Sequence, residues 1–282
     1  MGLYQNLING TTPNFNYTVE YLHHYTDLKG INGILQKIKE CIWASGIRYL
    51  NDSLEFKYVF DKFCGYLNKK DKELFQNVFK DFLDSDEVKK NAESVFVISF
   101  STVNDSLSQW RGYGGETCGF SINFIPNKLR DYVTKLQAES NNVNVRLSKC
   151  YYQEAEHKEI ICEYWNVNKD KLKKNDGDEV KINAWLDLCK LASCIKHPKF
   201  EEEQEWRIII ENPSECRIKH RCRKSYLVPY IEFDISHNVE DLIDSITIGP
   251  TIDKKITRSS ISSLLGETGI TLNETEIPYR NW

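Results

Sequence analysis

Four carboxylates occur within five residues of the segment KHPKFEEEQEWRIII (196–210), and Trp206 and three isoleucines follow them at once. A tryptophan followed by β-branched residues is typical of a buried strand. If that strand begins by residue 203, Glu203 and Glu205 share one of its faces, and Trp206 and Ile208 share the other. Two carboxylates on one face repel each other, and partial burial raises the pKa of one of them.

An acidic pair of this kind is what paired-carboxylate chemistry requires, because one group stays ionised while the other can hold a proton. The alternative is that these residues lie in solvent, in a loop ahead of the strand, because charged clusters are often only structural. Composition alone favours the loop.

Histidine, serine and aromatic residues elsewhere could hold a ligand. In HHYT (23–26), a histidine beside a tyrosine can bind ligand hydroxyls and stack on a ring, although a histidine taken alone is more often a satisfied interior residue. Ser99 and Ser101 alternate on one face of a predicted strand. Trp110 and Tyr113 are three residues apart, so they share a face of a helical turn and form either a core pair or a ligand platform. Asn51 and Asp52, ahead of Glu55, are typical of a helix cap.

The sequence does not predict a metal site. The nine cysteines are irregularly spaced and form no C-x-x-C pair, which argues against a zinc site and against a disulfide framework. Scattered thiols fit a reducing cytosol, so we expect a cytoplasmic protein. Phosphate-binding, dinucleotide-binding, zinc-protease and esterase motifs are also absent from the sequence.

Composition and charge exclude little else. An apolar content of 40% is ordinary for a globular protein, and a net charge of −4 gives no general attraction to nucleic acid or membrane. A local basic patch remains possible at KHRCRK (219–224). No secretory signal and no apolar run long enough to span a bilayer is present, so we expect no membrane partner.

Hydrophobic periodicity predicts helices early in the chain and strands later. We expect a short strand ending near Tyr25, then helices over 28–45, 48–67 and 72–85, with Thr26 or Asp27 capping the first. Residues 154–195 look helical, and a last helix is expected over 254–268. The expected strands are 94–102, 117–124, 143–152, 205–210, 225–233 and 243–250. This order predicts an α+β fold with a mixed or antiparallel sheet, as a single domain (1–282) with a helical insertion at about 154–196.

The order of these motifs is more specific than any one of them. H-Y-T, L-N-D-x-x-E, S-F-S, D-S-x-x-x-W-x-x-Y, C-G-F, F-x-x-E-x-E-W-R and I-x-x-I-x-I-G-P follow one another along roughly residues 20–280. This succession resembles a widespread bacterial family known as domain of unknown function family 2971. The E-x-E-W-R and N-D-x-x-E blocks are its most diagnostic parts.

The motif layout of that family looks like that of ADP-ribosyltransferases and of related toxin and phage-defence enzymes. The resemblance therefore implies an ADP-ribosyltransferase-like fold and an NAD-consuming enzyme, either a transferase or an NAD glycohydrolase. NAD would be its substrate, and a protein or nucleic acid its possible acceptor. The resemblance makes Glu205 the catalytic carboxylate and Glu203 its partner. The cofactor-binding residues that it implies are His24 on the ribose hydroxyls, Trp110 or Tyr113 near the nicotinamide, Ser99 and Ser101 bracing the site, and Tyr25, Thr26, Asn51, Asp52 and Arg207 around them.

Two other functions fit the same residues. A metal-dependent nuclease or nucleotide hydrolase could use Asp52, Glu55, Glu203 and Glu205. A non-catalytic nucleotide-sensing module could hold an anionic ligand with KHRCRK and the aromatic pair. The sequence fixes neither the acceptor nor the oligomeric state.

Overall fold

A computed structural model of the chain describes residues 2–8, 19–35, 40–50, 55–80, 95–115, 118–140, 143–174, 177–223, 225–236 and 238–279. The helices are α1 (Leu3–Ile8), α2 (Leu28–Leu35), α3 (Glu55–Tyr66), α4 (Lys69–Val78), α7 (Leu107–Tyr113), α8 (Pro126–Glu139), α9 (Glu154–Lys174), α10 (Asp178–Ala192), α11 (Val239–Leu242) and α12 (Lys254–Leu265). Short 3-10 turns are η1 (Ile47–Tyr49), η2 (Pro198–Glu203) and η3 (Glu215–Arg217). The strands are β1 (Leu22–Asp27), β2 (Cys41–Gly46), β3 (Val95–Ser101), β4 (Cys118–Phe124), β5 (Asn144–Lys149), β6 (Glu205–Glu211), β7 (Lys219–Arg223), β8 (Tyr226–Asp234), β9 (Ile243–Thr251) and β10 (Thr271–Glu274).

Within the described residues, these strands form one ten-stranded open sheet. Its main path runs β10-β9-β4-β1-β3-β2-β8-β7, while β6 pairs with β3 and β5 pairs with β6. β10 and β9 are parallel, and the other pairs are antiparallel. Helices follow the strands without regular alternation. The predicted α+β class with a mixed, mostly antiparallel sheet is therefore confirmed.

The sheet divides at β3. One edge of β3 pairs with β6 along its whole length. The other edge is shared, because β1 pairs with it only at Ser101 and β2 pairs with it only at Phe96 and Val97. Between these contacts the sheet splits into two wings, one continuing through β1 and β4 and the other through β2 and β8. We call this point the fork.

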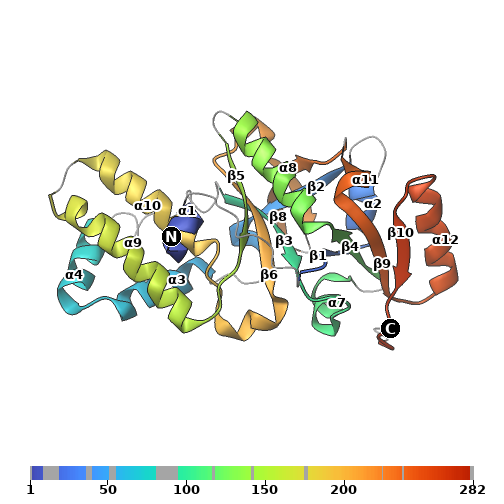
Figure 1. The fold of residues 1–282 in the computed structure, drawn as a ribbon, viewed down its shortest axis with the longest axis horizontal. Coiled ribbons are helices and arrows are strands. Elements are labelled where there is room, and N and C mark those ends of the chain that lie inside the picture. Colours follow the sequence, from blue (N-terminus) through green and yellow to red (C-terminus); the bar gives the residue numbers. More distant parts are fainter. Residues whose placement is uncertain are drawn as a thin grey trace.

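Two hydrophobic cores lie on the two faces of the sheet. The alternation of β6 shows how they are separated, since Trp206, Ile208 and Ile210 pack into one core and Ile209 packs into the other. The first core includes side chains of α2, α8, α11 and α12. The second core is built with α1, α3, α4, α9 and α10, which gather at one end of the molecule in Figure 1.

Most predicted elements are present, with two corrections. The predicted helix over 28–45 is wrong in its second half, because α2 is described only to Leu35 and residues 41–46 form β2. Ile42 and Trp43 find backbone partners in β8, and Ser45 and Gly46 find theirs in β3, so these tertiary contacts override the helical pattern. Asp27 caps α2, since its Oδ1 accepts from the Gly30 amide at 2.7 Å. The predicted strand at 143–152 ends at Lys149. Of α7, only a helical turn at Trp110 and Tyr113 was expected, and α1, α8, α11, β7 and β10 were not predicted.

Candidate functional site

Glu205 is the first residue of β6 and lies at the edge of the second core. The expectation that this strand begins by residue 203 is wrong, because residues 198–203 form η2. Gln204 joins the two elements with a left-handed backbone (φ 42°), which turns the chain inward. Glu205 is consequently 5% exposed, whereas the Glu203 side chain remains 18% exposed.

The two carboxylates nevertheless converge, because one lysine binds both. Lys196 Nζ lies 2.5 Å from Glu203 Oε2 and 2.7 Å from Glu205 Oε2. Arg207 binds Glu205 bidentately, with Nε 2.8 Å from Oε1 and Nη2 3.0 Å from Oε2. Two acids and two bases thus form a buried, charge-balanced group, which we call the ionic cluster. Its arginine is fixed from the other side, since Arg207 Nη1 donates to the carbonyl of Ser193 at 3.0 Å.

The cluster gives its two carboxylates different proton affinities. Burial alone would raise the pKa of Glu205, but Arg207 and Lys196 outweigh it and hold the pKa at about 2. Burial raises the pKa of Glu203 above its ordinary value, and Lys196 opposes this only in part. Glu205 is therefore a fixed anion, and Glu203 is the carboxylate that can exchange a proton nearer neutral pH.

Polar groups surround Glu205 on its remaining sides. The Tyr152 hydroxyl accepts from the Glu205 amide at 2.9 Å, and Cys150 Sγ lies 3.9 Å from Glu205 Oε2. Burial raises the pKa of the Cys150 thiol, which keeps it neutral. Burial and then the charges of Glu203 and Glu205 raise the pKa of Tyr113 to about 12, so this phenol at the end of α7 keeps its proton.

Serine and histidine blocks adjoin the cluster on neighbouring strands. Ser101 on β3 is paired with Glu205 on β6 and with His23 on β1, so these three side chains lie in a row on one face of the sheet. The Ser101 hydroxyl donates to the carbonyl of Glu203 at 2.6 Å, which fastens η2 to the sheet. Ser99, two residues earlier on the same face, is paired with Arg207.

The two adjacent histidines serve different faces. His24 follows His23 in the strand and therefore points away from the Ser101–Glu205 row. Its ring packs 5.7 Å from that of Phe100, and its Nδ1 donates to the carbonyl of Ser99 at 2.9 Å, where the sheet forks. His23 is buried on the side of the row, with Nδ1 2.8 Å from Asn123 Oδ1. The sequence prediction chose His24, and only the register with β3 identifies His23 as the neighbour of Ser101.

Trp110 occupies a buried socket. It is 3% exposed, its indole nitrogen donates to Asp105 Oδ1 at 2.8 Å, and the Tyr25 ring meets it edge-on at 4.8 Å. The socket depends on Gly119 and Gly249, because a Cβ there would lie 3.0 Å and 2.7 Å from ring carbons of Trp110. The motifs H-Y-T, D-S-x-x-x-W, C-G-F and I-G-P therefore pack together and fix α7 against the sheet. Trp110 offers no open ring face to a ligand.

Thr26 lies beside α2, away from the row, with its hydroxyl against Gly30. Asn51 and Asp52 fall outside the described residues. No trio of His, Cys, Asp or Glu side chains in the described ranges is arranged to hold a metal ion. Among the helices described, none is both long and apolar enough to cross a membrane.

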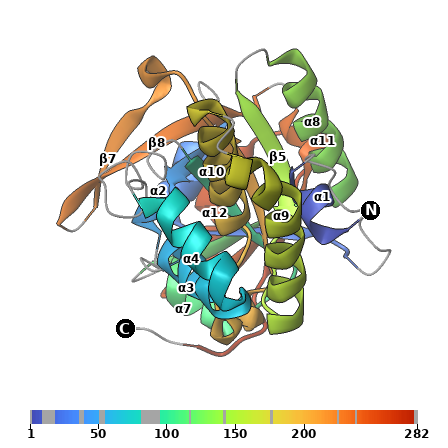
Figure 2. The same cartoon turned by 90° about the vertical axis from the view of Figure 1, so that its left-hand side faces the viewer.

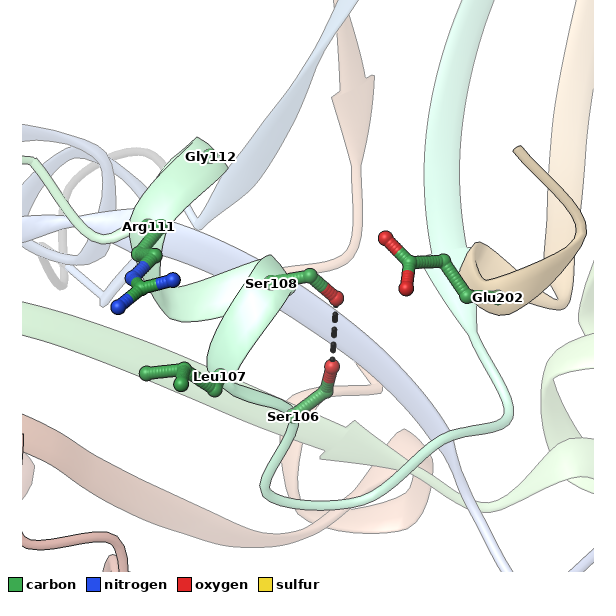
Figure 3. A pocket seen from close by; sticks show the side chains of 6 residues that line it. All are labelled: Ser106, Leu107, Ser108, Arg111, Gly112 and Glu202. Carbon is green, nitrogen blue, oxygen red and sulfur yellow. Dashed lines mark hydrogen bonds between the residues drawn. The ribbon is translucent and has the colours of Figure 1, made fainter. Parts of the chain in front are cut away.

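A groove opens between α7 and η2. It has a volume of about 710 Å³, and its lining residues are Ser106, Leu107, Ser108, Arg111, Gly112 and Glu202. Figure 3 shows Glu202 extending from η2 toward Ser108 across the groove. The Ser106 and Ser108 hydroxyls are 3.0 Å apart. The four residues of the ionic cluster do not line this groove, although Glu203 and Tyr113 directly follow the lining residues Glu202 and Gly112 in sequence. Hydroxyl, guanidinium and carboxylate groups suit a polar ligand.

Fold and site together define an α+β protein with a buried ionic cluster and a separate polar groove. Residues 109–208 match the family described as "Protein of unknown function (DUF2971)". The match contains the Trp110 and Tyr113 positions, C-G-F and E-x-E-W-R, and it supports the resemblance to that family over this segment. Comparisons with curated proteins and with solved structures gave no match.

Proposed function

We propose that the protein is an NAD-consuming enzyme, an ADP-ribosyltransferase or NAD glycohydrolase of toxin or phage-defence type, with an ADP-ribosyltransferase-like fold. The observation that carries the proposal is the ionised Glu205 joined through Lys196 to Glu203, whose pKa is raised. The arrangement of the histidine, serine and glutamate blocks on the adjacent strands β1, β3 and β6 supports it.

The chemistry of NAD cleavage suits this charge arrangement. When the bond between ribose and nicotinamide breaks, its electron pair leaves with nicotinamide and positive charge develops on the ribose. A preorganised anion in a water-poor site stabilises such a transition state. Both oxygens of Glu205 are occupied by Arg207 and Lys196, so we assign contact with the ribose to the more exposed Glu203. Glu203 can also accept the proton of the attacking water or acceptor.

A pair of glutamates on η2 provides the test. Glu203→Gln removes the proposed reacting carboxylate, and Glu201→Gln is its matched control, because Glu201 is exposed on the same turn. Release of nicotinamide from NAD is measured by chromatography with and without cell extract, and labelled NAD distinguishes transfer to a macromolecule from hydrolysis. We expect Glu203→Gln to lower kcat on the order of 100-fold with little change in KM, and Glu201→Gln to retain activity.

Full activity in folded Glu203→Gln would refute the assignment of the carboxylate. Intact NAD after prolonged incubation with the wild-type protein and extract would refute the proposed function itself.

A non-catalytic nucleotide-binding module is the second candidate. The occupied oxygens of Glu205 favour it, because a carboxylate held by two cations is also a common structural element. NAD binding by calorimetry without any nicotinamide release, unchanged in Glu203→Gln, would support this candidate over the enzyme.

A further inference from the structure

The β7–β8 hairpin ends one wing of the sheet and extends away from the helices in Figure 2. β7 has the sequence KHRCR, and most of its side chains are exposed. An edge strand that exposes its backbone and side chains is available for a partner. Neither the ionic cluster nor the groove uses this hairpin.

One face of the hairpin carries all the permanent cations of β7. Lys219, Arg221 and Arg223 alternate along the strand and therefore point the same way. Their partners on β8 are Tyr230, Val228 and Tyr226, respectively. Alternate residues of a strand are about 6.6 Å apart, so the three cations form a line and do not converge on one point.

Aromatic rings continue the same face. The ring centroids of Trp43 on β2 and Tyr230 are 4.9 Å apart, and those of Tyr49 on η1 and Tyr226 are 6.1 Å apart. Tyr226 is 46% exposed at the tip of the hairpin. We call Lys219, Arg221, Arg223, Tyr226, Tyr230 and Trp43 the cationic face.

Contacts within the cationic face hold its arginines in place. Arg221 donates to the Ser45 hydroxyl at 2.7 Å and lies 5.4 Å over the Trp43 ring. Arg223 Nη1 donates to the carbonyl of Tyr49 at 3.1 Å. Burial and then the charge of Arg223 lower the pKa of Arg221, so the two guanidiniums repel each other. Lys219 is paired with Glu232 at 2.7 Å.

We propose that the cationic face binds single-stranded nucleic acid, with phosphates along Lys219, Arg221 and Arg223 and a base stacked on Tyr226. Linear cations match a chain of phosphates, and aromatic rings on a sheet surface stack on unpaired bases. An acidic peptide would use the charges but leave the rings without a role, and anionic vesicles are included in the test because tyrosine and tryptophan rings also bind at membrane interfaces. This proposal does not depend on NAD chemistry.

The test is fluorescence anisotropy with labelled 20-nucleotide polyuridine RNA and polythymidine DNA at several salt concentrations. The double variant Lys219→Gln/Arg223→Gln is compared with Lys128→Gln/Lys135→Gln, which removes two exposed charges from α8 instead. We expect the hairpin variant to bind at least about 10-fold more weakly, and the slope of log K against log salt to fall by about 1.4, because each lost contact with a single strand removes about 0.7. The α8 variant should bind as the wild type does.

Tyr226 tests the role of stacking separately from charge. Tyr226→Leu should weaken binding by about 5- to 100-fold and Tyr226→Phe should preserve it, because a base needs the ring and not the hydroxyl. Thermal melts of each variant confirm folding. The proposal is overturned if neither strand binds below about 100 μM at 100 mM salt, a range that covers even ordinary non-specific binding. It is also overturned if both double variants weaken binding equally, or if polyglutamate or anionic vesicles bind more tightly than the strands.

Discussion

Replacing Glu205 with glutamine removes the central negative charge of the ionic cluster while nearly preserving its shape. In the wild type, the folded protein holds the pKa of Glu205 at about 2, against an ordinary value of 4.5. A group whose pKa is lower in the folded state stabilises that state above its unfolded pKa, and this stabilisation is lost as pH falls through the folded pKa. The stability of the wild type should therefore depend on this carboxylate most strongly at neutral pH.

The magnitude follows from the difference in pKa. One pKa unit corresponds to about 1.4 kcal/mol, so a fall from 4.5 to about 2 contributes about 3 kcal/mol to the free energy of unfolding at pH 7. The same relation leaves less than about half of this contribution at pH 3. Glu205→Gln should thus lose about 3 kcal/mol at pH 7 and progressively less below pH 4.5.

Urea unfolding followed by circular dichroism between pH 7 and pH 3 measures this difference. Glu201→Gln, on the exposed side of η2, is the control and should change the free energy of unfolding by less than about 0.5 kcal/mol at every pH. A difference between wild type and Glu205→Gln that stays constant down to pH 3 would show that Glu205 is not held ionised by Arg207 and Lys196. The same experiment explains why Glu203, and not Glu205, is the cleaner position for testing catalysis.

Two further variants test the cluster and the socket. Lys196→Gln should lower the free energy of unfolding by about 3 kcal/mol or more, because it leaves buried carboxylates without their shared cation, whereas Lys190→Gln, in a more exposed pair with Asp187, should lower it by less than about 1 kcal/mol. Gly249→Ala should destabilise by about 1–3 kcal/mol through overpacking against Trp110, whereas Gly65→Ala, with no atom within 4 Å of the new methyl group, should be neutral or slightly stabilising in thermal melts. Equal effects of either variant and its control would contradict the corresponding contact.

The sequence predicted elements well where periodicity and packing agree. The apolar run of β3 and the alternation of β6 are confirmed, since Trp206 and Ile208 indeed lie opposite Glu205. β2 was missed because its six residues continue a helical pattern, and only pairing with β3 and β8 makes them a strand. β7 was read as a charged patch, because its side chains alternate between two exposed faces and leave no apolar period.

The geometry of the candidate site was predicted in part, whereas the roles of its residues stay predictions. Glu203 and Glu205 do come together, although a shared lysine unites them and not a common strand face. Lys196 was missed because it precedes a turn, where no periodic pattern fixes a side chain's direction. Its position in KHPKFEEE, close to an acidic run, was the available signal. The choice between His23 and His24 depends on strand register, which one sequence does not contain.

The strands that pair with β4 and with β6 decide whether the segment 109–208, which matches the family, could fold alone. β4 lies between β1 and β9, and both of these neighbours are outside the segment. β6 would keep β5 but lose β3. A fragment cut at these limits would expose unpaired strand edges and lack most of the first core and part of the second, and exposed edges of this kind associate with other chains. The stretch of sequence most easily recognised is thus shorter than the smallest piece of this chain that we expect to fold, and expression trials should start from the full sheet.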